Sequence, residues 1–196
     1  MGHAAAGLSS NAVTARFRST RHGPTANFAA GEVVLLGVLL AELMTLLDHE
    51  APTTSPDADP LETLTGMTDS NQSGVAPEDP VLARLLPDAY ADDPERAAEF
   101  RRDTEDELRT AKREAAHTVL QSLPESGGRI VLDQKMADAW LGALNDLRLA
   151  LGTRLEVTEE SYKELEGLDP TTRRARELSI YMWLGWLQET LIDTQH

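Results

Sequence analysis

The chain has 196 residues, a formal net charge of −15 at pH 7 and no cysteine. The lack of cysteine excludes disulfides, thiolate zinc sites and cysteine nucleophiles, and the five histidines are too scattered to predict a metal site. The acidic balance repels phosphate backbones, so nucleic acid is not an expected partner. Neither a metal nor any other cofactor is expected.

The first fourteen residues, MGHAAAGLSSNAVT, are expected to be a disordered N-terminal extension of a single helical domain over residues 15–196. They lack the basic and apolar regions of a secretory signal, which favours a cytoplasmic location. Between Ala15 and Phe28 the sequence predicts two short extended pieces around a Gly-Pro turn. With the β-branched run from Gly128 to Leu132, they are expected to form a small three-stranded sheet at one edge.

Six helices are predicted in chain order. Asp-Pro dipeptides indicate several of the starts, because Asp accepts free backbone N–H groups and Pro fits the first helical turn. Asp133 gives the same signal without proline. The predicted helices cover residues 29–49, 80–86, 94–123, 133–151, 158–165 and 170–193.

The longest apolar run, VVLLGVLLAELMTLL from Val33 to Leu47, belongs to the first of these helices. Glu42 interrupts it, and it is shorter than the roughly 20 residues that cross a bilayer. It therefore predicts a core helix, and no membrane partner is expected. Residues 51–78, rich in Pro, Thr, Ser and Asp, predict a mobile acidic loop between this helix and the next.

For two other helices the sequence predicts which faces are buried. The helix from Asp133 repeats large apolar residues at helical spacing and has a second apolar face, which predicts packing on two sides. The long helix over residues 94–123 is expected to bury one apolar stripe and to leave its charges in solvent. The expected faces are Trp140, Leu144, Leu147 and Leu151, then Leu141 and Leu149, and, for the long helix, Phe100, Leu108, Ala111, Ala115 and Val119.

Three ordered blocks carry a resemblance to a known family. They are DPVLARLLPDAYADDPERAAEFRRDTEDELRTAKREAAHTVLQSLP, LDQKMADAWLGALNDLRLALGTRLEVTEE and IYMWLGWLQETLI. The chain resembles, over about Arg16 to Ile192, the actinobacterial family called domain of unknown function two-thousand-and-seventeen. The resemblance implies no reaction or ligand, since none is established for the family. It implies a gene context beside the adaptor of the Clp protease, and some members are labelled putative transcriptional regulators.

No nucleotide-binding loop, zinc helix or hydrolase elbow motif occurs, so no catalytic residue is predicted. One acidic residue nevertheless falls on an apolar stripe. Glu32 is in line with Leu36 in the first helix, where a free carboxylate would be costly. It is expected to accept free N–H groups at the helix start, or to pair with Arg84 or Arg148 from neighbouring helices.

The last helix contains IYMWLGWL, which is apolar around its whole circumference. Trp183 and Trp186 lie about 60° apart on it, and Gly185 is expected to permit a close helix crossing. Either both tryptophans belong to the core, or they line a groove that accepts a peptide or a partner helix. The rim of that groove would be formed by Glu189, Asn145 and Arg148.

The sequence therefore predicts a mainly α protein, an irregular multi-helix bundle with a small β-hairpin or three-stranded element. We expect it to be an intracellular protein-interaction or regulatory module, with a protein partner. Two alternatives stay open. One is a small-molecule-binding enzyme that uses Glu32, Arg148 and Glu189; the other is a transcription-associated regulator that uses a basic face between Arg16 and Arg21.

Overall fold

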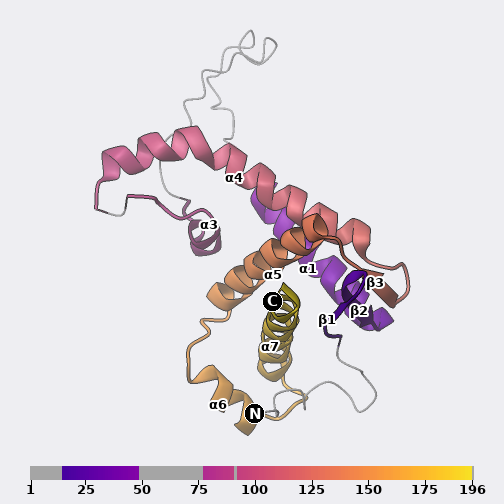
Figure 1. Ribbon diagram of the computed structural model, residues 1–196. Helices are drawn as coiled ribbons and strands as arrows, with labels where there is room; N and C mark the ends of the chain where they lie inside the picture. Colours follow the sequence, from indigo (N-terminus) through magenta and orange to yellow (C-terminus); the bar gives the residue numbers. More distant parts are fainter. Residues whose placement is uncertain (1–14, 49–76, 91, 196) are drawn as a thin grey trace, which may run out of the picture.

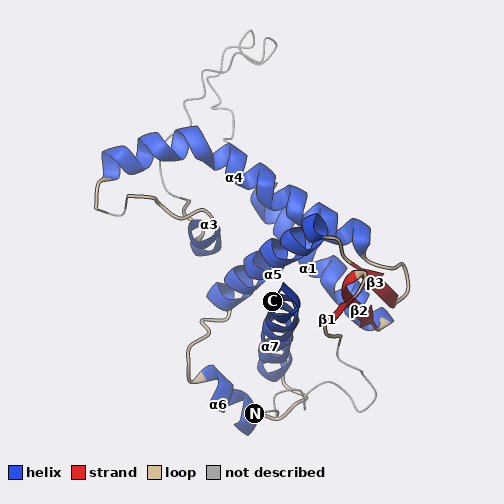
Figure 2. Ribbon diagram, in the orientation of Figure 1, coloured by secondary structure: helices blue, strands red, loops and turns tan. Residues whose placement is uncertain are grey.

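The computed structural model describes residues 15–48, 77–90 and 92–195. The expected extension at residues 1–14 and most of the expected loop, residues 51–76, lie outside these ranges. The described residues form six α-helices and one three-stranded sheet. The strands gather at one edge of the helical assembly, in red in Figure 2. The mainly α fold with a small β element is confirmed.

The sheet combines an N-terminal hairpin with a strand from the middle of the chain. Strands β1 (Arg18–Thr20), β2 (Gly23–Phe28) and β3 (Gly128–Val131) lie in the order β1-β2-β3, and both pairings are antiparallel. The hairpin turn needs Gly23, whose φ is +110° and where an added Cβ would meet the Leu132 carbonyl oxygen at 2.2 Å.

Three helices begin at the predicted aspartates. α3 (Pro80–Leu85), α4 (Pro94–Ser122) and α5 (Gln134–Arg154) each have an Asp whose side chain accepts a backbone N–H of the first turn. The N-cap residues are Asp79, Asp93 and Asp133.

The start predicted at Asp169 is wrong. Its carboxylate accepts the Thr171 N–H at 2.8 Å and so forms a local turn, while Thr172 becomes the N-cap of α7 (Arg173–Ile192). The short α6 (Ser161–Gly167) precedes this turn, and a 3₁₀ segment, η1 (Asp193–Gln195), follows α7.

Helix α5 lies at the centre, in contact with α4, α7, α3 and α1 (Figure 1), so the predicted packing on two sides is confirmed. Trp140 on α5 is fully buried, and its indole N–H donates to the Ser122 hydroxyl at 2.9 Å. The centre of the Trp140 ring lies 5.4 Å from the centre of the Phe17 ring and 5.6 Å from the centre of the Phe28 ring. This aromatic cluster fixes the sheet to the helical core.

Helix α1 (Ala30–Asp48) contributes one leucine face to the core and is long and apolar enough, by length and composition, to cross a membrane. The prediction of a core helix holds only for that face, because the opposite face is exposed. The inward residues are Leu36, Leu40, Leu43 and Leu47.

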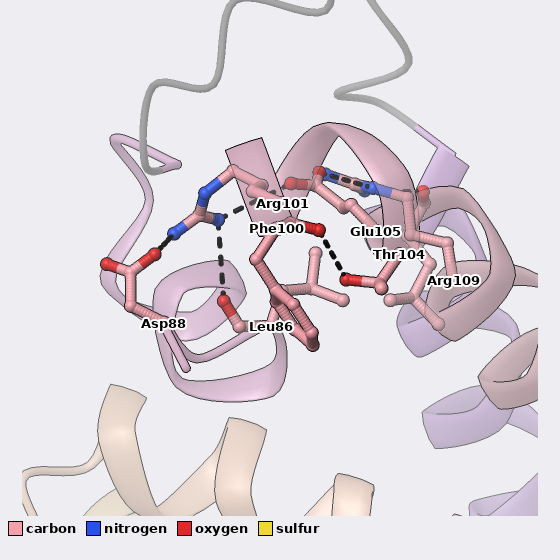
Figure 3. Close-up of polar contacts among 8 residues, drawn as sticks. Leu86, Asp88, Phe100, Arg101, Thr104, Glu105 and Arg109 are labelled. Atoms are coloured by element: carbon pink, nitrogen blue, oxygen red, sulfur yellow. Dashed lines mark hydrogen bonds and ion pairs between the residues drawn. The ribbon is translucent and has the colours of Figure 1, made fainter. Parts of the chain in front are cut away.

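Helix α4 differs from the prediction. Phe100 and Leu108 of the expected apolar stripe are 43% and 38% exposed, whereas Arg101 and Arg109 are buried; Val119 is buried as expected. Figure 3 shows these arginines on either side of Glu105, which Arg109 contacts at 2.7 Å. Each guanidinium also reaches the end of a neighbouring helix.

The carbonyl contacts explain why the charges face inward. Arg109 donates to the Leu47 carbonyl oxygen at 2.8 Å, at the end of α1. Arg101 donates to the Leu86 carbonyl oxygen at 3.5 Å, just after α3, and pairs with Asp88 (Figure 3). The last carbonyl groups of a helix lack intrahelical partners, and here guanidinium groups of α4 bind them.

Candidate functional site

The two tryptophans of the last helix have different environments. Trp183 is 4% exposed and belongs to the core, whereas Trp186 is 42% exposed. Neither expectation for the pair holds as a whole, because one indole packs inside and the other faces outward. Of the two tryptophans of α7, Trp186 is therefore the one that faces solvent.

A hollow of about 370 Å³ lies beside Trp186, between the start of the hairpin and the end of α7. We call it the Trp186 hollow. Its lining combines an indole, a phenyl ring, two guanidinium groups, one carboxylate and two hydroxyl groups. The lining residues are Arg16, Phe17, Arg18, Trp186, Thr190, Asp193 and Thr194.

The extended backbone presents the arginines of the hollow. Phe17 is 3% exposed and packs in the aromatic cluster, while Arg16 and Arg18 on either side of it are exposed. This alternation follows from extended geometry, in which successive side chains point to opposite sides. The Phe17 N–H donates to the Thr190 hydroxyl at 3.2 Å, which attaches the residue just before β1 to α7.

Glu32 positions the segment that leads into β1. Its two carboxylate oxygens accept the N–H groups of Ala15 and Ala29, both at 2.8 Å. The expectation that Glu32 uses free N–H groups at the helix start is confirmed. The expected ion pair with Arg84 or Arg148 is wrong, because two backbone N–H groups already bind the carboxylate. Glu32 thus holds Ala15 next to Arg16.

Arg148 interacts with α7 instead. Its guanidinium donates to the Gln188 side-chain oxygen at 2.5 Å and lies 5.5 Å from the centre of the Tyr181 ring. An added Cβ at Gly185 would come within 3.4 Å of Arg148 Nε, so Gly185 allows the close crossing of α5 and α7 that was predicted. Arg148 therefore joins two helices and does not line the Trp186 hollow.

The remaining predicted site residues do not converge. Asn145 on α5, Glu189 on α7 and Arg84 on α3 are exposed, and none of them lines the hollow. Within the described ranges, no contact joins Glu32, Arg148 and Glu189 into one polar cluster. No group of three or more residues able to hold a metal ion was found in the described part of the chain.

Sequence reasoning singled out the basic face between Arg16 and Arg21 and, separately, Trp186, but it did not bring them together, and it missed Phe17, Thr190, Asp193 and Thr194. Arg16, Phe17 and Arg18 lie about 170 positions before Trp186, and no local pattern connects the two segments. The one available signal was the alternation of charged and apolar residues in RFR, next to a strand.

A second hollow, of about 620 Å³, lies between the end of α5 and the start of α7. Arg154, Arg173 and Arg174 line it together with Glu42, Glu156 and Glu177. Arg173 pairs with Glu177 at 2.6 Å. Its charges balance one another, so it favours no class of ligand.

These features define an irregular helical bundle with an exposed aromatic and basic site. A family model for a domain of unknown function (DUF2017) matches residues 14–195, and the chain belongs to this family. The chain is 38% identical over 188 residues to the "Oxidative stress regulator AosR" of Mycobacterium tuberculosis strain H37Rv, covering 88% of this chain and 83% of the relative.

Two further relatives carry the same printed name or a close form of it. The Mycobacterium bovis protein "Oxidative stress regulator AosR" is 38% identical, with the same coverage. The Mycobacterium leprae protein "Putative oxidative stress regulator AosR" is 39% identical over 190 residues, covering 90% of this chain and 81% of the relative. No solved structure matches the chain.

Proposed function

We propose that this protein is a regulator of the response to oxidative stress and that it acts by binding another protein at the Trp186 hollow. The likeness over most of the chain to proteins named oxidative stress regulators supports the regulatory role. The observation that carries the binding role is Trp186, a large indole that is 42% exposed at the end of an otherwise well-packed helix.

The chemistry of the hollow favours an apolar and acidic segment as its ligand. Tryptophan and arginine are the residues that most often dominate binding energy at protein interfaces. Between Ala15 and Gly31 the chain contains arginines and no acidic residue, although its net charge is −15. Arg16 and Arg18 outnumber Asp193 in the lining of the hollow and would therefore attract carboxylates of the partner, while Trp186 would receive an apolar side chain.

The absence of cysteine limits how this regulator would work. Reversible oxidation of proteins to disulfides or sulfenic acids requires a thiol, which this chain does not contain. Any thiol-based redox chemistry in this regulation would therefore lie in the partner. This is a further reason to propose a protein ligand.

Affinity capture from lysates of untreated and peroxide-treated cells tests the proposal. Trp186→Ala should abolish capture of the partner and leave the fold intact, because the indole is already half in solvent. Tyr162→Ala is the matched control, since Tyr162 is 53% exposed on α6 and lies outside the hollow. The adaptor of the Clp protease should be included as a defined candidate partner.

A charge-reversed pair of variants tests the acidic character of the partner. Arg18→Glu should weaken binding by at least tenfold, whereas Arg102→Glu, an exposed position on α4, should not. Unchanged capture by both Trp186→Ala and Arg18→Glu would exclude the hollow as the binding site.

The exposed arginines also keep the transcription-associated alternative open. Arg16, Arg18 and Arg21 are exposed on one short segment. Three arginines release few counterions, so we expect no binding of duplex DNA at about 0.15 M salt. Sequence-specific binding at that salt concentration would favour the alternative and would point to the same arginines as the contact surface.

A further inference from the structure

The three-stranded sheet has one covered edge and one free edge. At the β1 edge, the Phe17 N–H donates to the Thr190 hydroxyl and η1 lies beside the strand. At the β3 edge, no helix or strand of the described ranges lies alongside Gly128–Val131. An edge strand presents unpaired N–H and C=O groups, to which another strand can bind. β3 is therefore the strand of this sheet that is open to a partner.

The register shows which backbone groups point to the free edge. In an antiparallel pair, residues opposite each other turn their backbone groups either toward one another or away, in alternation. The Leu132 N–H, just after β3, donates to the Pro24 carbonyl oxygen at 2.8 Å, which continues the register of the pair. Ile130, two residues earlier, therefore also faces β2. Arg129 and Val131 alternate with these positions, so their N–H and C=O groups point away from β2 to the free edge.

The side chains of Arg129 and Val131 lie together on the open face of the sheet. Arg129 is exposed and Val131 is 41% exposed, whereas Ile130 between them is buried in the core. A strand added beside β3 would place two of its own side chains directly opposite Arg129 and Val131. The edge therefore favours a strand with an acidic residue opposite Arg129 and an apolar residue opposite Val131.

The charge of the sheet also favours an acidic strand. The three strands and the hairpin turn contain no acidic residue, in a chain of net charge −15. They contain three arginines, Arg18, Arg21 and Arg129, all of which are exposed. The acidic residues that flank β3 in the sequence, Glu125 and Asp133, lie beyond its two ends. The sheet thus attracts carboxylates that the rest of the surface repels.

We propose that β3 binds an extended, acidic segment of another protein as a fourth strand of the sheet. The segment would run antiparallel to β3, as in the two existing pairings, and would exchange two main-chain hydrogen bonds with Arg129 and two with Val131. From its N- to its C-terminus it would contain an apolar residue, one intervening residue and an acidic residue. Neither Arg129 nor Val131 lines the Trp186 hollow, so this site goes beyond the proposed function and does not depend on it.

Titration of the isotope-labelled full chain with a synthetic peptide tests the proposal by NMR. The probe is acetyl-Thr-Thr-Val-Thr-Glu-Thr-Thr-amide, which contains the proposed pattern. The amide signals of Arg129 and Val131 should shift, with a dissociation constant below about 1 mM. The same peptide with Lys in place of Glu should bind at least tenfold more weakly. Unchanged amide signals of β3 at about 1 mM peptide would overturn the proposal.

Methylation of the peptide backbone separates strand pairing from attraction between side chains. A methyl group on the amide nitrogen of the valine or the glutamate removes an N–H that would face β3, so the dissociation constant should rise at least tenfold. The threonine between them turns its N–H away from β3. Its methylation is the matched control and should leave the affinity close to that of the parent peptide. Equal effects at the two kinds of position would show that the peptide does not add a strand.

Charge reversal on the protein tests the acidic residue of the partner. Arg129→Glu should weaken binding of the glutamate peptide at least tenfold and should strengthen binding of the lysine peptide, because the charges opposite each other are exchanged. Loss of folding would not give this exchange of preference. Arg102→Glu, at an exposed position of α4, is the matched control and should change neither affinity. An Arg129→Glu variant that keeps the parent's preference for glutamate would contradict the proposal.

Two further measurements distinguish this site from others. Trp186→Ala should leave the affinity for the glutamate peptide unchanged; loss of binding would place the peptide in the Trp186 hollow and overturn the β3 site, but not the proposed function. A single-stranded oligonucleotide should not shift the amide signals of Arg129 and Val131 at about 0.15 M salt. A shift of these signals by the oligonucleotide and not by the peptide would make the edge a nucleic-acid site instead.

Discussion

Helices α1 and α4 pack against each other, but they expose and bury opposite kinds of residue. α1 buries leucines and exposes Val34 and Val38, so it is apolar on both faces. α4 exposes charged residues such as Arg102 and also buries Arg101 and Arg109, so it is charged on both faces. The buried charges of α4 have partners within the fold. The exposed face of α1 carries no charge between Val34 and Val38, so the two packed helices distribute charged and apolar side chains in opposite ways.

The largest expected effect concerns the charged inner face of α4. Arg109→Ala should lower the free energy of unfolding by about 3 to 5 kcal/mol, because it leaves Glu105 and the Leu47 carbonyl oxygen without the guanidinium. Denaturant unfolding measures the change. Arg102→Ala, on the exposed face, should change stability by less than about 0.5 kcal/mol. Equal costs for the two would mean that Arg109 is not a structural charge.

The second prediction compares the two faces of α1. Leu40→Ala should cost about 2 to 5 kcal/mol, because Leu40 is fully buried and its loss leaves a cavity. Val38→Ala should leave the stability of the monomer within about 0.5 kcal/mol. Thermal unfolding at low protein concentration gives both values. A large cost at Val38 under these conditions would mean that the Val38 side chain packs within the monomer.

A smaller effect is expected at Gly37. Gly37→Ala should raise the free energy of unfolding of the monomer by about 0.5 to 1 kcal/mol, because alanine restricts the unfolded chain and favours the helix. Gly142→Ala in α5 is the control, since an added Cβ there also meets nothing within 4 Å. A destabilising effect at Gly37 alone would indicate a contact that the described structure lacks.

The smallest effect is a dependence on pH. Burial raises the pKa of the Asp146 carboxyl on α5, while the Lys112 ammonium of α4 at 2.7 Å acts in the opposite direction. Since the pKa is raised in the folded state, the contribution of Asp146 to stability is complete below the ordinary value of 3.8 and is lost as pH rises through the folded pKa.

Asp146→Asn removes this titration. The stability of the parent relative to the variant should therefore fall as pH increases from about 4 to 7 in denaturant unfolding. A difference that grows with pH would show that the attraction of Lys112 outweighs burial.

Local signals in the sequence predicted the elements well. Asp79, Asp93 and Asp133 marked three helix starts because a cap depends only on the residues of the first turn. Asp169 failed because Thr172 competed for the same role three residues later. The sheet was predicted from β-branched residues and the Gly-Pro turn, which are also local.

Faces of helices were predicted less well, because burial depends on neighbours far along the chain. α1 is apolar all round, so its sequence does not distinguish Leu40 from Val38. In α4 the apolar Phe100 appeared to belong inside, but the carbonyl groups at the ends of α1 and α3 draw Arg101 and Arg109 inward instead. The Trp186 hollow was not predicted, because it forms where Arg16 to Arg18 meet the end of α7, far along the chain.

That contact also bears on how the protein is made. The bond from the Phe17 N–H to Thr190 spans 173 residues, so the Trp186 hollow closes only when α7 has formed. During synthesis the hairpin leaves the ribosome long before α7, and such long-range closure is slow. An incomplete chain would therefore lack the hollow altogether, and the binding proposed for it would begin only after the last helix is released.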